Sequence, residues 1–367
     1  TNLFEIPKGV GYLILISVLI SIGLSIFIYI KEKQNQHMIW KRSNLLIIKY
    51  VFLLSKKSHR NNKQLYYSLN FLKLLIPNFL YRNSLKKNLD EIQKYDDDYI
   101  KMRVNFYNKL DRDINLSENV SELSKLKIKN FHKTYFFDSY EFTRYFKSSL
   151  KMNFLFGDIT HIPEIPSIVK SRPIAENQKN SILFKLNKVR HFTYTNDSNQ
   201  FADKKNILIG RGAVTKKHKK RTSFYKIYFN HHLCDLGQIN KNTDHNRWIK
   251  DKISIEDHLK YKFVLCIEGV DVATNLKWVM SSNSIAVMAK PKIESWFMES
   301  KLVADYHYIE INDDYSNLEE KLNYYINNVD ECLKIIENAN TYVSQFKDYN
   351  REKLISLLVL EKYFIKT

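Results

Sequence analysis

The stretch ILIGRGA at residues 207–213 decides the fold of this 367-residue chain. A short apolar run ends in a glycine turn, and the basic run Lys216–Arg221 leads into a helical pattern that opens at Thr222. A strand that passes through glycines into a helix is the repeating unit of a parallel sheet covered on both faces. Peptide N–H groups, nearby cations and a helix N-terminus also make such a turn a site for phosphate.

The turn departs from two common phosphate motifs. Thr215 stands where a dinucleotide-binding fingerprint needs its third glycine, and the spacing is not that of a P-loop. Arg211 or Arg221 could clamp a pyrophosphate through paired hydrogen bonds. The lysines of 216–220 also fit a solvated loop, and both interpretations stay open.

Apolar runs and helical patterns alternate from residue 153 onward, which predicts an α/β fold with a mostly parallel sheet. The last two helices, about 330–347 and 350–365, are expected to close this domain. The other predicted elements are strands at 206–209, 232–236, 262–267, 284–288 and 306–311, and helices at 221–230, 255–261, 274–281 and 317–327.

A second strand–glycine–helix stretch, CIEGVDVATNLK, occupies residues 266–277. Thr274 or Asn275 would cap the helix, and the N–H groups of residues 271–275 would face an anion, with Lys277 one turn further on. A capped structural helix explains the same pattern.

A third stretch, NFLFGDI at 153–159, places Asp158 at a strand tip, where a carboxylate can act as a general base. An aspartate that caps a turn is the alternative. Asp235 is a further acid at a strand end. Five of the chain's eight glycines end or follow predicted strands, which indicates positive φ or close backbone approach at these places; they are Gly157, Gly210, Gly212, Gly237 and Gly269.

No metal site is expected. His231, His232 and Cys234 resemble one only superficially, because adjacent histidines on a regular element point apart. The three cysteines fit neither a disulfide framework nor a zinc pattern.

The formal net charge is +19, and residues 31–95 hold 14 Lys/Arg against 3 Asp/Glu. Residues 9–30 carry no charge, and 22 helical residues span roughly 33 Å, about one bilayer core. We therefore predict a single transmembrane anchor in residues 1–35 and a basic helical membrane-proximal segment in 36–95. The positive flank puts the rest in the cytoplasm, at the inner membrane. A cleaved signal peptide is the alternative for the apolar run, and an ordinary helical subdomain with a solvated basic side is the alternative for the basic segment.

Long, ordered motifs between about residues 95 and 345 resemble glycosyltransferase family 90, in its bacterial lipopolysaccharide A protein branch. The motifs are Phe156–Thr160, Pro166–Pro173, Asn187–His191, Arg211–Ala213, Leu233–Asn240 and the segment from Lys260 to Ser284.

The resemblance implies a GT-B-like α/β fold. An N-terminal lobe at 96–204 would carry the catalytic aspartate and the acceptor side, a Rossmann-like lobe at 205–345 would bind the nucleotide sugar, and a C-terminal helix would follow at 346–367. It also implies inversion at the sugar carbon, no metal and no cofactor. The donor would be UDP-glucose or UDP-galactose, and the acceptor lipopolysaccharide or lipooligosaccharide at the membrane.

By matching position, Asp158 is the expected catalytic base. Asn275 stands where animal members of the family carry a cation, so Lys277 is expected to supply more of the positive charge at the nucleotide diphosphate. Lys170, Arg172, Arg190 and Asp235 are candidates for donor or acceptor contact. The expected nucleotide-sugar-binding residues are Arg211, Gly212, Ala213, Arg221, Gly269, Val270, Asp271, Val272, Ala273, Thr274, Asn275 and Lys277.

Two other classes of protein compete with this hypothesis. The charge would suit a membrane-associated nucleic-acid-binding protein, but no helix-turn-helix, RNA-recognition or zinc-finger pattern is present, so we expect no nucleic-acid partner. A non-catalytic membrane scaffold that kept the fold is the second alternative, and the intact Asp158, Arg211 and Gly269 disfavour it.

Overall fold

The computed structural model describes residues 62–130, 132–241 and 246–367. The chain divides into two compact units, Thr1–Leu75 and Ile76–Thr367. In the first unit the described part is helix α3 (Lys63–Leu74), whose N-cap Asn62 accepts a hydrogen bond from the Leu65 N–H at 3.1 Å. The predicted membrane anchor lies outside the described residues. Among those that are described, no helix is both long enough and apolar enough for a membrane span.

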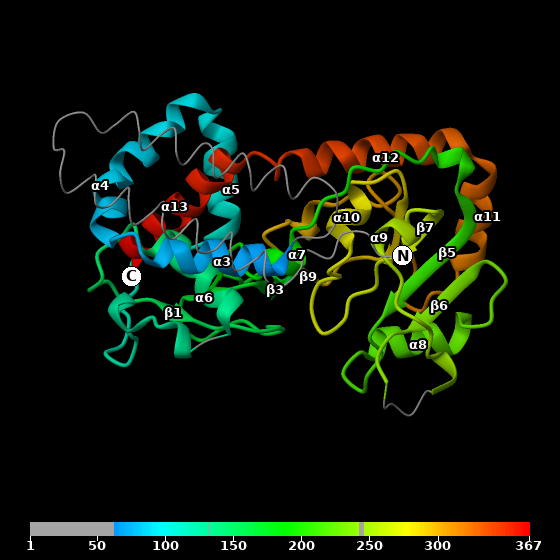
Figure 1. Cartoon of the computed structure of the whole chain (residues 1–367), viewed down its shortest axis with the longest axis horizontal. Coiled ribbons are helices and arrows are strands. Elements are labelled where there is room, and N and C mark those ends of the chain that lie inside the picture. Colours follow the sequence, from blue (N-terminus) through cyan, green and yellow to red (C-terminus); the bar gives the residue numbers. More distant parts are fainter. Residues whose placement is uncertain (1–61, 131, 242–245) are drawn as a thin grey trace, which may run out of the picture. The chain divides into compact units, whose positions relative to one another are not determined.

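The second unit contains two lobes (Figure 1). The helices of its N-terminal lobe are α4 (Asn78–Leu89), α5 (Asp97–Tyr107), α6 (Lys133–Thr143), α7 (Lys188–His191) and α13 (Tyr349–Lys366). Its parallel sheet has the order β1-β2-β4, from β1 (Asn153–Phe154), β2 (Ser167–Val169) and β4 (Ser181–Leu183). A two-stranded antiparallel pair joins β3 (Ser171–Pro173) to β9 (Ile293–Ser295).

The C-terminal lobe is built on a five-stranded, fully parallel, Rossmann-like sheet with the order β10-β8-β7-β5-β6. Every strand predicted for this region is confirmed, with ends shifted by at most three residues. Its strands are β5 (Lys205–Gly212), β6 (Cys234–Gln238), β7 (Tyr261–Leu265), β8 (Ile285–Ala289) and β10 (Ile309–Ile311), and its helices are α8 (Lys219–Tyr228), α9 (Ile255–His258), α10 (Leu276–Met280), α11 (Leu318–Asn327) and α12 (Val329–Ser344).

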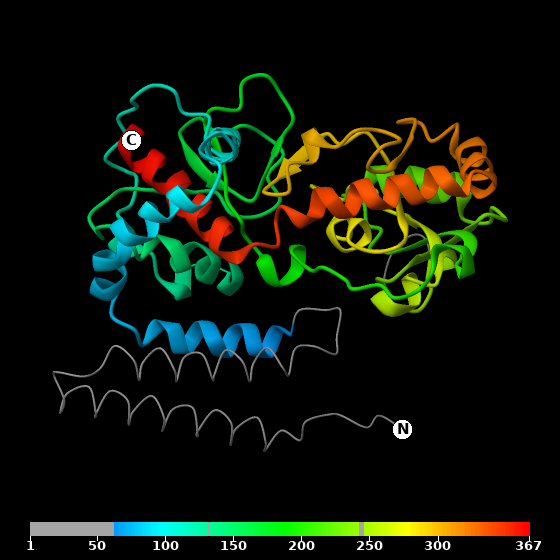
Figure 2. The same ribbon diagram turned by 90° about the horizontal axis from the view of Figure 1, so that it is seen from above.

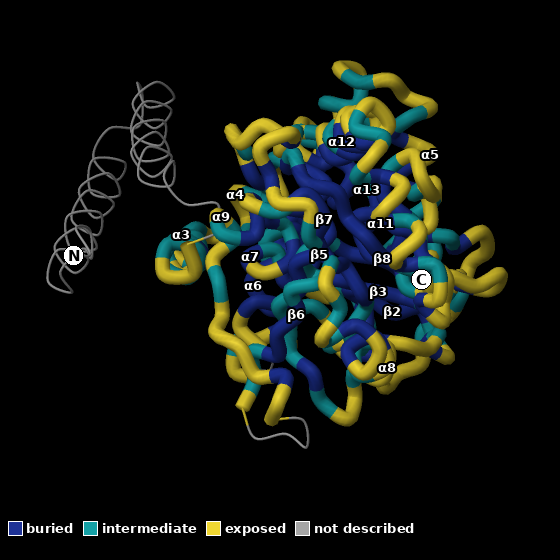
Figure 3. Tube along the Cα trace, turned by 90° about the vertical axis from the view of Figure 1, so that its right-hand side faces the viewer, coloured by how far each residue is buried: buried dark blue, intermediate teal, exposed yellow. Residues whose placement is uncertain are grey.

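Alternating side chains of this sheet enter two different cores, because successive residues of a strand point to opposite faces. On β5, Leu208 packs in the core covered by α8 and α11, whereas Ile209 packs in the core covered by α10 and α12. The second core is continuous with that of the N-terminal lobe. Strands buried on both faces read as unbroken apolar runs, which is why they could be found from the sequence; Figure 3 shows them as the buried centre.

The sheet has a topological switch point between β5 and β7. The chain leaves β5 through α8 to β6 on one side, and β7 lies on the other side of β5. The connections after β5 and β7 therefore lead to opposite sides of the sheet, and a crevice is expected at the carboxyl ends of these two strands, where open α/β sheets bind ligands. Both sequence stretches predicted to hold phosphate lie at this point.

The last helix does not close the C-terminal lobe as predicted. Helix α12 packs on α10, α11 and β8, but α13 crosses over and packs against α4, α5 and α6 of the N-terminal lobe (Figure 2). The buried Glu352 of α13 explains this placement. It pairs with Arg103 of α5 at 2.8 Å and Lys185 at 3.1 Å, and it accepts a hydrogen bond from Trp296 Nε1 at 2.6 Å.

Replacing Glu352 by Gln leaves the buried Arg103 without its counter-charge. We expect unfolding free energy to fall by about 3–5 kcal/mol, measured by urea denaturation. Lys321, whose pair with Asp305 lies at the surface, is the control, and Lys321→Gln should change stability by less than about 1 kcal/mol. Equal effects of the two substitutions would contradict the assignment of α13 to the N-terminal lobe.

Candidate active site

Asp158 lies in the loop after β1, directly behind Gly157. Gly157 has a φ of +118°, which glycine adopts readily and other residues rarely do. The turn leaves the Asp158 side chain 43% exposed, with Oδ1 2.5 Å from Lys170 Nζ. Oδ2 makes no hydrogen bond to any other residue in the described ranges, so this oxygen is available to a ligand.

Lys170 connects β2 to β3 and is buried, with 3% of its side chain exposed. Its Nζ also lies 2.7 Å from Asp271 Oδ2, in the loop after β7. Burial lowers the pKa of Lys170, but the charge of Asp271 and the neighbouring Tyr135 and Asp158 outweigh it, so the pKa is raised. Asp158, the catalytic aspartate expected from the sequence, and Asp271, an expected nucleotide-sugar-binding residue, thus both contact the ammonium group of Lys170.

The loops after β5 and β7 meet at the guanidinium of Arg221 on α8. Nη1 donates to Ala213 O at 3.0 Å, and Nη2 donates to Ile267 O at 3.3 Å. A Cβ on Gly212 would lie 3.3 Å from Nη1, and one on Gly269 would lie 3.2 Å from Nη2. The three segments predicted to hold a diphosphate are therefore brought together, and their role in binding stays a prediction.

Positive charge is concentrated at this point. Burial lowers the pKa of Arg221, and the charge of nearby Arg190 acts in the same direction. His218, beside Gly269, has its pKa lowered by burial and by Arg221. Neither Arg221 nor Arg190 forms a salt bridge within the part of the chain that the structure describes. Cations without counter-charges favour an anionic ligand.

Arg211, the other arginine that the sequence offered as a clamp, does not share this arrangement. Its Nη2 lies 2.9 Å from Asp235 Oδ1, and its Nη1 donates to Asp235 O at 2.7 Å. Strand alternation directs Arg211 away from the face on which Gly212 meets Arg221. The Asp235 carboxylate is also already paired, since Lys250 forms a second ion pair with it at 2.8 Å. Burial raises the pKa of Asp235, but these two hydrogen bonds outweigh it and lower the pKa.

Two further predicted ligand cations are closed into buried ion pairs. Arg172 on β3 pairs with Glu294 on β9 at 2.7 Å, and neither side chain is more than 1% exposed. Lys277 on α10 pairs with Glu299 at 2.8 Å, with 0% and 2% of the side chains exposed. Unpaired, these charges would be costly to bury, so the fold supplies acids to both. Their side chains therefore do not line the crevice.

The predicted cap of α10 also differs. Asn275 occupies the N-cap position, but its side chain makes no capping bond and its Nδ2 donates to Leu265 O at 2.9 Å. The loop is ordered instead by Gly269 N, which donates to Asp271 O at 3.1 Å, and by the contacts of the Asp271 side chain. Asn275 thus ties the loop back to the end of β7.

A cavity of about 170 Å³ lies between the loops that follow β7 and β8. Val272, Ala273 and Met288 form part of its apolar lining, and Lys290 is among its polar residues. Glu268 joins the two loops, since its Oε1 accepts the N–H groups of Lys292 and Ile293 at 2.9 and 3.0 Å. The cavity is large enough for one ring of a ligand held at the crevice.

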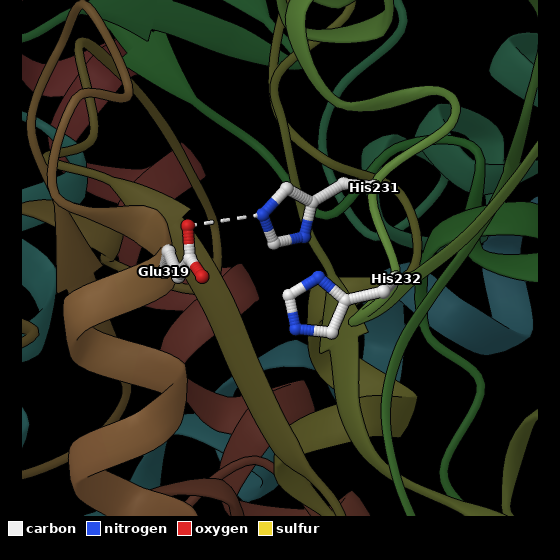
Figure 4. A group of neighbouring side chains, drawn as sticks. All are labelled: His231, His232 and Glu319. Atoms are coloured by element: carbon white, nitrogen blue, oxygen red, sulfur yellow. Dashed lines mark hydrogen bonds and ion pairs between the residues drawn. The ribbon is translucent and has the colours of Figure 1, made fainter.

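The described residues contain one group of side chains close enough to share a metal ion, namely His231, His232 and Glu319 (Figure 4). Sequence reasoning missed it because the two histidines stack at 4.6 Å in a turn, and Glu319 comes from α11. The Leu233 N–H points at His231 Nδ1 at 3.3 Å, which places the ring proton on Nε2, 3.2 Å from Glu319. His231 therefore ties the turn to α11 through its hydrogen bond with Glu319.

His191 is a functional-site neighbour that the local pattern did not single out. It is 3% exposed, and its Nε2 is buried without a hydrogen-bond partner among the described residues. Burial lowers its pKa well below the usual value, and the charges of Lys277, Lys170 and Arg190 add to this. Tyr135 and His218 are further neighbours of the site for which the sequence held no local signal.

Comparison with known proteins shows the family of the chain. Residues 184–356 match the profile of the family described as Glycosyl transferase family 90. The chain belongs to this family, and it is a glycosyltransferase. A curated relative, the O-glucosyltransferase LpsA of Dichelobacter nodosus, is 38% identical over 265 residues, which is 72% of this chain and 82% of the relative.

Because His191 stays neutral in the folded chain and takes up a proton when unfolded, stability is lost as the pH falls below about 6.5. Between pH 6.5 and 5 this residue should account for roughly 1.5 kcal/mol of lost unfolding free energy. The measurement is urea denaturation of wild type and His191→Gln across this range. Identical pH slopes for both proteins would contradict the neutral buried imidazole.

Proposed function

We propose that the protein is an inverting glycosyltransferase that moves a hexose from a UDP-sugar to a lipopolysaccharide core or a related cell-surface glycan. The observation that carries the proposal is the pairing of one partly exposed carboxylate, Asp158, with a cationic crevice at Arg221. Lys170 and Asp271 join the two halves through contacts of 2.5 and 2.7 Å.

Sugar transfer by inversion needs one carboxylate and one cationic site for the leaving group, and it needs no second acid. The acceptor hydroxyl oxygen attacks the anomeric carbon, and Oδ2 of Asp158 takes the hydroxyl proton. The bond from that carbon to the phosphate oxygen breaks on the opposite face, and its electron pair stays with the departing UDP. Positive charge and peptide N–H groups stabilise that leaving group, so one carboxylate is enough, whereas an inverting hydrolase needs two.

The donor side fits the crevice. Arg221 and Arg190 would face the diphosphate together with the backbone of residues 211–213 and 269–271. The arginines take the place of a metal ion in this proposal, so we propose that the reaction needs no divalent metal or other cofactor. Between UDP-glucose and UDP-galactose, the name of the relative, an O-glucosyltransferase, favours UDP-glucose.

The proposed acceptor and the proposed cellular location are supported by features of the sequence. An inner-core sugar with phosphate groups would suit a chain of net charge +19. The uncharged residues 9–30 and the basic segment that follows support an inner-membrane anchor with the catalytic part in the cytoplasm. These features also support action on a glycolipid that is held in the same membrane.

Replacement of Asp158 by Asn should abolish sugar transfer, because the amide cannot accept the hydroxyl proton. UDP binding should stay within about five-fold of wild type, because the cationic half is intact. UDP release from UDP-glucose with truncated lipopolysaccharide reports the first quantity, and calorimetry with UDP reports the second. Near-normal turnover of Asp158→Asn would remove Asp158 from the role of base.

Arg221→Met should weaken UDP binding by roughly 10- to 100-fold, the equivalent of losing a charged hydrogen bond of about 1.5–3 kcal/mol. Arg211→Met is the comparison, because this guanidinium is bound to Asp235 and should change UDP affinity by less than about three-fold. A larger loss in Arg211→Met than in Arg221→Met would show that Arg211, and not Arg221, is the clamp.

A further inference from the structure

Lys170 holds two carboxylates that come from different lobes. Asp158 Oδ1 lies 2.5 Å from its Nζ, in the loop after β1, and Asp271 Oδ2 lies 2.7 Å from it, in the loop after β7. Tyr135 from α6 also interacts with this ammonium group, and the charge of Lys170 helps to lower the pKa of the buried His191 in α7. One cation thus fixes an acid on each side of the crevice.

Burial makes this pairing obligatory. With 3% of the Lys170 side chain exposed, water cannot replace a lost carboxylate, and a buried ammonium without a counter-charge is strongly disfavoured. Asp271 is in the same position, with 8% of its side chain exposed. Asp158 is the partly solvated member, and it is the one free to meet a substrate.

The backbone of Lys170 is fixed by the residues that follow it. Ser171 Oγ donates to Asp271 Oδ2 at 3.0 Å, and Arg172 forms the buried pair with Glu294. These two residues belong to β3, which is hydrogen-bonded to β9. Three consecutive side chains therefore contact acids contributed by the C-terminal half of the chain, and Lys170 has little freedom to move away from Asp271.

Asp271 in turn belongs to the loop that borders the cationic crevice. Its carbonyl accepts the Gly269 N–H at 3.1 Å, and Gly269 packs against the Arg221 guanidinium. The order of contacts therefore runs from Asp158 through Lys170 and Asp271 to the loop that would hold the donor diphosphate.

We propose that Lys170 is a positioning residue of sugar transfer, which orients the Asp158 carboxylate and ties it to the donor-binding loop through Asp271. This inference rests on the proposed function. Its consequence is that the base is held in place by the same contacts that order the donor loop. Lys170 itself touches neither substrate.

The charges predict opposite effects for two substitutions. Lys170→Met removes the cation and leaves Asp158 facing another acid, so the acid limb of the rate profile should move to higher pH by about one unit or more. Asp271→Asn keeps the cation and removes the competing acid, so the acid limb should move to lower pH. A purely structural role for Lys170 predicts neither shift.

The experiment measures single-turnover transfer from UDP-glucose to truncated lipopolysaccharide between about pH 3 and pH 9, so that both limbs of the profile fall inside the range, with UDP affinity from calorimetry. Lys170→Met should lower the rate on the order of 100-fold, as expected when a reacting group is misplaced by about 1 Å. UDP affinity should fall by less than about five-fold. Asp271→Asn keeps an oxygen that can accept hydrogen bonds from Lys170 and Ser171. If Lys170→Met does not fold, Asp271→Asn still tests the proposal, because its acid limb should move to lower pH.

Lys204→Met is the matched control, because Lys204 is also buried and pairs with Asp197 at 2.7 Å, with no contact to Asp158. It should lower the melting temperature and leave the rate and its pH profile unchanged. The inference is overturned if Lys170→Met keeps the rate within three-fold, or if the acid limb stays in place in both site variants. Equal rate losses in Lys204→Met and Lys170→Met would also overturn it.

The two proposals fail differently. If wild type neither binds UDP nor releases it from UDP-glucose, the proposed function fails and the role of Lys170 fails with it. If wild type transfers glucose and the Lys170 and Asp271 variants behave like it, the function stands and the positioning role alone is wrong.

Discussion

The buried ammonium of Lys170 between Asp158 and Asp271 is the interaction on which the site depends. A charge removed from water must be paired, and here the two available acids belong to loops at the ends of β1 and β7. The pairing fixes the separation between a carboxylate that can take a proton and the crevice that can take an anion. A reaction that uses both groups at once needs this separation to be held constant.

The cations near the crevice divide into two groups, those with an acidic partner and those without one. Arg172, Lys277 and Arg211 are neutralised by acids that lie 122, 22 and 24 residues away in the sequence. Arg221 and Arg190 form no salt bridge in the described parts of the chain. Because the paired cations contribute little field, the two unpaired arginines mark where a diphosphate would be stabilised.

The two lobes share one continuous apolar core, and the chain crosses between them more than once. Pairing of β3 with β9 brings the residues after Lys170 against the C-terminal half, while α13 returns to the N-terminal lobe through Glu352 and Arg103. Lobes joined in this way keep the groups on the two sides of the crevice at a constant separation. Acid–base chemistry requires such a fixed distance.

The sequence by itself determined the parallel sheet and the strand ends that carry glycine, because doubly buried strands read as apolar runs and close backbone approach requires Gly212 and Gly269. It also placed Asp158 at a strand tip. Only the tertiary structure decided which cations face the crevice, where α13 packs, and that Lys170 joins two acids. Each of these depends on partners in other elements, from 12 residues away for Asp158 and Lys170 to 249 for Arg103 and Glu352, or on the opposite face of a strand, and local patterns carry no information about either.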